Sequence, residues 1–237
     1  MEHKKIVISL GGSLLSDNFT YKHIACYVAV FEKLHRDGYN VIVTVGGGKT
    51  ARQYIDILSG KKFSSSKEKH IKCDMIAVAV THCNALLLKY LTDDKMVYPK
   101  IPKSNFAIRS AIKEQQKNGC IIYCGGTHPN QSTDGVASFC ALTSGANLIV
   151  NATNIDGVYT KNPKEHKDAK KTEKLSFNEF KKIISLNAQT PGKYALFDLW
   201  AIPRLKRKKI RLIVLDGREP ENILRAVEGE SIGTEVS

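Results

Sequence analysis

Five short apolar runs recur along the chain, and glycine or polar residues follow each of them. The runs cover residues 6–10, 41–45, 120–124, 148–152 and 212–215. Runs of this length without polar alternation are typical of strands that are buried on both faces of a parallel sheet. We therefore expect five strands at the centre of the fold.

Amphipathic segments with helical spacing separate these runs. They cover residues 21–36, 51–58, 74–91, 106–117, 134–144 and 196–208. Strand, glycine turn and helix in repeated succession predict right-handed crossovers, with helices on both faces of a mainly parallel sheet. The pattern therefore predicts an α/β fold in one domain over residues 1–237. Because the later motifs form a separate cluster, we expect two lobes that divide near residue 145.

The composition favours a globular protein of the cytoplasm. Hydrophobic residues make up 42% of the 237 residues, and no apolar stretch approaches the about 20 residues that a membrane helix needs. The amino-terminal apolar run enters a glycine turn without a cleavage site, so a buried strand fits better than a signal peptide. Six cysteines lie mostly in apolar segments and lack metal-ligand spacing, so we expect reduced core thiols: Cys26, Cys73, Cys83, Cys120, Cys124 and Cys140.

The chain carries a net charge of +13, mainly from lysine. The basic residues gather at 161–182 and 204–211. Such an excess attracts nucleotides or nucleic acid, but no aromatic residues are interleaved with it as they are on a base-stacking surface. We therefore favour a solvated lysine-rich face over a nucleic-acid interface.

Four polar or glycine-rich turns fall at the carboxyl ends of predicted strands, where open parallel sheets bind ligands. They are residues 11–13 (GGS), 46–49 (GGGK), 125–134 (GGTHPNQSTD) and 153–159 (TNIDGVY). Backbone N–H groups in such turns are open to phosphate oxygens. One glycine pair indicates only a tight turn, but four at equivalent positions favour a phosphate site. Neither the P-loop pattern nor the dinucleotide pattern is present.

The ordered motifs SLGGS (9–13), VGGGKTARQYI (45–55), GGTHPNQSTDGVA (125–137), TNIDGVYTKNP (153–163) and FDLWAI (197–202) resemble those of the amino acid kinase family. The resemblance runs from about residue 4 to residue 235, and within the family it is similar to the archaeal-type UMP kinases. It implies a three-layer αβα fold with an amino-terminal acceptor lobe and a carboxyl-terminal ATP lobe. It also implies transfer of a phosphoryl group from ATP to UMP with Mg²⁺, and assembly into hexamers built from dimers.

The resemblance also implies the acceptor site. Asp74 matches the residue that holds the ribose hydroxyls, although an acidic residue at a helix N-terminus would also be stabilised there. His128 is expected either to contact the acceptor phosphate or to be an exposed loop histidine. The full set of expected UMP-binding residues is Gly47, Asp74, Thr127, His128, Pro129, Asn130, Gln131, Ser132 and Thr133.

The donor site and the catalytic groups follow from the same resemblance. The expected ATP-binding residues are Gly12, Ser13, Gly48, Arg52, Thr153, Asn154, Tyr159 and Asn162, and the expected catalytic residues are Asp134, Asp198, Arg52 and Lys49. Asp134 has an alternative reading as the cap of the following helix, and Tyr159 one as a half-buried aromatic at a strand end. Mg²⁺ is expected to bind through the nucleotide phosphates, with no metal site made by the protein alone.

Three positions depart from the family pattern. Ser9 and Pro203 stand where many members carry lysine, and Asn162 stands where aspartate is more usual. Charge neutralisation would then fall to Mg²⁺, Lys49, Arg52 and backbone amides. Other acceptors remain open (isopentenyl phosphate, fosfomycin, carbamate or an amino acid), although the stretch GGGKTARQYI lacks the histidine typical of the first two. A catalytically weak nucleotide sensor is a further alternative.

Overall fold

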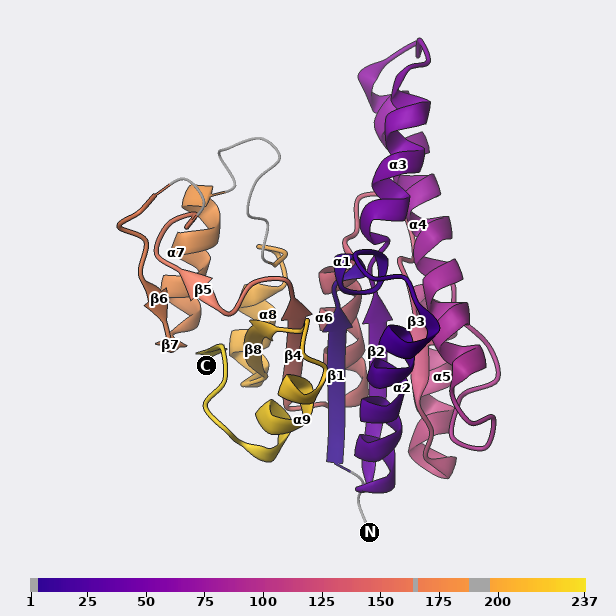
Figure 1. The fold of residues 1–237 in the computed structure, drawn as a ribbon, viewed down its shortest axis with the longest axis vertical. Helices are drawn as coiled ribbons and strands as arrows, with labels where there is room; N and C mark the ends of the chain where they lie inside the picture. The colour runs from indigo at the N-terminus through magenta and orange to yellow at the C-terminus, as the bar shows by residue number, and fades with distance from the viewer. Residues whose placement is uncertain (1–3, 164–165, 188–196) are drawn as a thin grey trace.

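The computed structural model describes residues 4–163, 166–187 and 197–237 (Figure 1). One sheet of seven strands, in the order β3-β2-β1-β4-β8-β9-β7, runs through these residues. The five predicted strands are confirmed: β1 (Lys4–Leu10), β2 (Tyr39–Val45), β3 (Ile122–Cys124), β4 (Leu148–Thr153) and β8 (Arg211–Asp216). These five are all parallel to their neighbours within the set, as the buried apolar runs predicted.

Four short strands were not predicted. β9 (Thr234–Val236) pairs antiparallel to β8, and β7 (Lys174–Leu175) pairs parallel to β9. β5 (Val158–Tyr159) and β6 (Lys171–Thr172) form a separate antiparallel pair. Two or three residues are too few to show an alternating pattern, so sequence periodicity could not have found them.

Helices cover both faces of the sheet and give the predicted three layers (Figure 1). One face packs against α2 (Tyr21–Arg36), part of α4 (Ser66–Leu91) and α9 (Glu221–Glu228). The other packs against α5 (Asn105–Asn118), α6 (Thr133–Ser144), α7 (Phe177–Asn187) and α8 (Ile202–Lys208). Along β1, Ile6, Ile8 and Leu10 face the first layer and Val7 the second. Strand alternation therefore directs Ser9 towards α6 as well.

The helix predicted over residues 74–91 is longer than expected. α4 begins at Ser66, because the Ser65 hydroxyl accepts from the Glu68 amide and the Glu68 carboxylate accepts from Ser64. This capping arrangement stabilises additional polar turns at the start of the helix, and hydrophobic periodicity cannot predict such turns. The reading of Asp74 as a helix N-terminal residue is therefore wrong. α4 is long and apolar enough to pass as a membrane span by composition, which is weak evidence, and here it lies along α3 (Gly48–Ser59) and the sheet.

Two further expectations need correction. The helix predicted over 196–208 begins only at Ile202, after turns at 199–201, and its first expected residue lies outside the described residues. The cysteines are all free, but Cys26 and Cys83 are exposed rather than part of the core. Cys26 and Cys83 lie in α2 and α4, which both carry many apolar residues, so the sequence did not distinguish these two exposed cysteines from the buried ones.

Candidate active site

The turns that follow the central strands are linked to one another by backbone hydrogen bonds. The Gly11 amide donates to the Ala152 carbonyl (2.9 Å), and the Gly46 amide donates to the Leu10 carbonyl (2.9 Å). The Gly217 amide donates to the Thr153 carbonyl (2.7 Å). The ends of β2, β1, β4 and β8 therefore form one continuous rim, as the sequence predicted for the turns after the first, second and fourth runs.

The first two glycine turns pack backbone against backbone at the centre of this rim. A Cβ atom added to Gly46 would lie 2.6 Å from the Gly12 nitrogen, and Gly48 has a φ of 62°. The short helix α1 (Gly12–Ser16) starts here, and its Ser16 hydroxyl accepts from the Lys49 amide (2.9 Å). Glycine is required at these positions because a side chain would separate the two turns.

A cavity of about 420 Å³ opens between α4 and the loop that joins β3 to α6. Seven expected acceptor residues line it: Gly47, Asp74, His128, Asn130, Gln131, Ser132 and Thr133. The expected contacts Thr127 and Pro129 do not line the cavity. Thr127 instead donates its hydroxyl to Gln131 Oε1 (2.5 Å), which supports the loop from within.

Five residues line the cavity that sequence reasoning did not name: His70, Ala77, Val78, Thr81 and Gly126. The Thr81 hydroxyl accepts from the Gly126 amide (2.8 Å), and His82 Nε2 bonds to the Gly126 carbonyl (2.7 Å). Burial lowers the pKa of His82 below its ordinary value. Helical spacing from Asp74 would have identified Ala77, Val78 and Thr81 as neighbours on one face of α4.

Asp134 lies in the first turn of α6, where Ser9 meets it from the end of β1. The Ser9 hydroxyl donates to Asp134 Oδ1 over 2.7 Å. Desolvation raises the pKa of Asp134 to about 6; the Ser9 hydrogen bond opposes this rise, and the charge of Asp198 adds to it. The cap of α6 is Ser132, whose hydroxyl accepts from the Gly135 amide, so the reading of Asp134 as a cap is wrong.

Asp198 approaches the start of α6 from the segment before α8. Its Oδ2 accepts from the Ser132 hydroxyl (2.8 Å) and from Trp200 Nε1 (3.2 Å). Two carboxylates, Asp134 and Asp198, thus face the same helix end close to the Gly12 turn. Burial and, to a smaller extent, the charge of Asp198 disfavour the ionised form of Asp134, and a divalent cation with phosphate ligands would relieve both. The residues present therefore fit Mg²⁺ held jointly with nucleotide phosphates.

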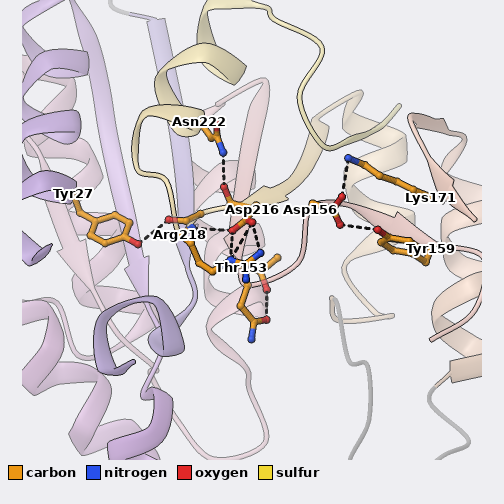
Figure 2. Close-up of polar contacts among 10 residues, drawn as sticks. Tyr27, Thr153, Asp156, Tyr159, Lys171, Asp216, Arg218 and Asn222 are labelled. Carbon is orange, nitrogen blue, oxygen red and sulfur yellow. Dashed lines mark hydrogen bonds and ion pairs between the residues drawn. The ribbon is translucent and has the colours of Figure 1, made fainter. Parts of the chain in front are cut away.

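A second polar group lies on the segment that follows β4 (Figure 2). The Thr153 hydroxyl donates to Asn154 Oδ1 (3.4 Å), and the Tyr159 hydroxyl donates to Asp156 Oδ1 (2.9 Å). Lys171 Nζ pairs with Asp156 Oδ2 (3.2 Å). Asn162 lies further along the same loop, where its carbonyl accepts from His166. The expected donor residues of this segment therefore lie in two separate hydrogen-bonded groups, Thr153 with Asn154 and Tyr159 with Asp156, followed by Asn162 further along the chain.

The turn after β8 adds an arginine that sequence reasoning did not assign. Arg218 Nε donates to Asp216 Oδ1 (2.9 Å) and Oδ2 (3.0 Å), and this pairing lowers the pKa of Asp216. The Tyr27 hydroxyl donates to the Gly217 carbonyl (2.7 Å), which fixes the turn from α2 (Figure 2). The sequence could have indicated this turn, because residues 216–218 follow the fifth apolar run just as the four glycine-rich or polar turns follow the other runs.

The other expected cations lie at the start of α3. Lys49 falls in its first turn and Arg52 one turn later, and both side chains are exposed. Pro203 lies in the first turn of α8, where proline fits because the first amides of a helix need no intrahelical acceptor. Within the described ranges, no group of three or more histidine, cysteine or acidic residues is placed to hold a metal ion by itself.

Known proteins resemble this chain over nearly its whole length. The model of the amino acid kinase family matches residues 4–216. The chain is 38% identical to the uridylate kinase of Methanococcus vannielii, with 97% of each chain covered. It is 36% identical to that of Methanothermobacter thermautotrophicus, with 98% of each covered. The crystal structure of uridylate kinase from Archaeoglobus fulgidus superposes with a TM-score of 0.82, at 34% identity, over 98% of this chain and 100% of that one. The chain belongs to the amino acid kinase family.

Proposed function

We propose that the protein is a UMP kinase, which transfers the terminal phosphoryl group of ATP to UMP and yields UDP and ADP. Relatives named uridylate kinase match it over nearly their whole length. The observation that carries the proposal is the cavity between α4 and the β3–α6 loop, which places Asp74 and the loop hydroxyls beside the glycine turns. The product supplies pyrimidine nucleotide synthesis.

On the acceptor side, the chain has to hold a nucleotide whose phosphate is already nucleophilic at neutral pH. We assign Asp74 to the ribose hydroxyls, because a carboxylate accepts from two hydroxyls at once. The loop of residues 127–133 surrounds the base and the phosphate, and Ser132 and Thr133 lie where a helix N-terminus favours an anion. Gly47 lets the acceptor approach the backbone. No general base is needed for this transfer.

On the donor side, the proposal assigns the ATP phosphates to Gly12, Ser13 and Gly48 and the nucleoside to Thr153, Asn154, Tyr159 and Asn162. Lys49 and Arg52 supply positive charge from α3. Bound with ATP, Mg²⁺ supplies further neutralisation of the charge that develops during transfer. Asp134 and Asp198 are the carboxylates that would hold it, and Ser9 keeps Asp134 oriented towards the transfer site.

The proposal extends to the organisation of the protein. We assign residues up to about 145 to an acceptor lobe and the rest to an ATP lobe, because every described residue that lines the acceptor cavity belongs to the first part. We also expect a homo-oligomer built from dimers and a cytoplasmic location. Sedimentation analysis at micromolar concentration tests the assembly state.

An ADP-release assay with ATP and Mg²⁺ tests the function. The acceptors to compare are UMP, CMP, dUMP, isopentenyl phosphate and fosfomycin. Turnover with UMP that is lost in Asp134→Asn supports the proposal, and turnover with isopentenyl phosphate or fosfomycin alone would replace the acceptor. Calorimetric binding of UMP and ATP without turnover would identify a nucleotide sensor instead.

A further inference from the structure

Asn130 lies at the turn of the acceptor loop, and two consecutive turns of α4 hold it. Its backbone amide donates to Asp74 Oδ2 over 2.8 Å. Its side-chain carbonyl oxygen accepts from His70 Nε2 over 3.0 Å. His70 and Asp74 are four residues apart and therefore face the same side of the helix, and both line the acceptor cavity.

The backbone of Asn130 makes this attachment necessary. Its φ is 64°, in the left-handed region that few residues other than glycine adopt. Asparagine tolerates this conformation better than most residues, but it persists only where the surroundings hold it. Since the amide and the side chain of Asn130 both bond to α4, the helix fixes the loop in this shape.

Asp74 has two tasks in this arrangement. Its Oδ2 accepts from the loop amide and lies 3.5 Å from His70 Nε2. Among the described residues no hydrogen bond to Oδ1 is present, so that oxygen is left to receive a ligand hydroxyl. His70 therefore contacts both the loop and the carboxylate assigned to the ribose, from a position at the edge of the cavity.

We propose that His70 is a positioning residue of the acceptor site. It holds Asn130, and with it the loop of residues 127–133, over the cavity, and it keeps Asp74 oriented towards the ribose hydroxyls of a nucleoside monophosphate. The inference rests on the proposed function, because the ribose is the group that Asp74 would bind. Neither the family motifs nor the glycine turns assign a role to this position.

The test compares His70→Ala with His70→Gln, whose side-chain amide can still donate to Asn130. Lys67→Ala is the matched control, because Lys67 is exposed on the same first turns of α4 and does not line the cavity. His70→Ala should raise KM for UMP about three- to tenfold, the effect of one lost hydrogen bond, with kcat and KM for ATP close to the wild-type values. His70→Gln should recover most of the loss, and Lys67→Ala should change neither constant.

Hydrogen exchange supplies a readout that does not depend on turnover. The Asn130 amide should exchange several-fold faster in His70→Ala than in the wild type or in Lys67→Ala, while amides in the second half of α4 keep their protection. Unchanged exchange at Asn130 together with an unchanged KM for UMP would overturn the proposal. A fall in kcat without a rise in KM for UMP would overturn it as well. A wild-type protein that is inert towards UMP would refute the proposed function, whereas the exchange result would still decide whether His70 holds the loop.

Discussion

The hydroxyl of Ser9 donates to Oδ1 of Asp134 over 2.7 Å, joining the end of β1 to the first turn of α6. Many members of the family carry lysine at the position of Ser9, so a neutral hydroxyl here faces the carboxylate that a cation would otherwise accompany. Asp134 is left with a raised pKa of about 6. Burial outweighs this hydrogen bond, so the ionisation of Asp134, which we propose to be catalytic, is sensitive to pH near neutrality.

Substitutions at Ser9 should move the acid side of the pH–activity profile in opposite directions. Ser9→Ala removes the hydrogen bond that favours the ionised carboxylate, so the pKa of Asp134 should rise and activity should fall at a higher pH. Ser9→Lys places a positive charge beside Asp134 and should lower that pKa. The measurement is kcat from pH 5 to 8. Profiles that coincide with the wild type in both variants would show that Asp134 ionisation does not limit turnover.

Asp134→Asn should abolish turnover and stabilise the fold at neutral pH. A carboxyl whose pKa is higher in the folded state than in the unfolded state binds its proton more tightly when folded. The free energy of unfolding therefore decreases as pH rises from about 4 to about 6, by about 3 kcal/mol in total. Asparagine does not ionise, so the free energy of unfolding of the variant does not decrease in this way as pH rises.

The check is chemical denaturation of the wild type and Asp134→Asn at pH 4.5 and pH 7.5. The stability advantage of the variant should be larger at pH 7.5 by about 2 kcal/mol. Asp37→Asn is the control, because Asp37 is exposed and pairs with Lys33 at the end of α2. An advantage that is equal at both pH values would contradict the burial argument for Asp134.

Arg218→Ala should weaken the binding of ATP and leave that of UMP unchanged. The arginine lies on the turn after β8, whose Gly217 amide bonds to Thr153 of the proposed donor site, and its loss also removes the guanidinium that pairs with Asp216. We expect KM for ATP to rise about tenfold, the effect of one charge-assisted contact. Arg225→Ala is the control, since Arg225, which lies on α9, forms a comparable exposed pair with Glu230. Equal effects of the two variants would exclude a specific role for Arg218.

Tyr27→Phe should destabilise the protein by about 1–2 kcal/mol. The Tyr27 side chain is fully buried, and its hydroxyl donates to the Gly217 carbonyl, so phenylalanine would leave a buried acceptor unpaired. Urea denaturation measures the change in free energy of unfolding. Because Gly217 precedes Arg218, KM for ATP should rise as well. A loss of stability without any change in KM for ATP would separate the turn from nucleotide binding.

Hydrophobic pattern predicted the five central strands well because each is a continuous apolar run buried on both faces. It predicted the start of α4 poorly, since the Ser65 cap and the polar turn after it have no apolar period. His70 lies in that missed part, which explains why sequence reasoning left it out of the acceptor site. The glycine turns predicted where the candidate site lies, but the Ser9 contact with Asp134 depends on strand alternation and the position of α6, which only the fold supplies.

The sheet runs without interruption from β3 to β7, and β1 is hydrogen-bonded to β2 on one side and to β4 on the other. The turns that we assign to the acceptor and to the donor therefore follow neighbouring strands of one continuous sheet, and no hinge separates those strands. Neighbouring strands are about 4.8 Å apart, so the spacing of the strands sets the distance at which the two phosphates approach each other in line. Any movement during turnover is then expected in elements that do not pack on the sheet, such as α3 and the early turns of α4, which extend beyond the strand ends (Figure 1).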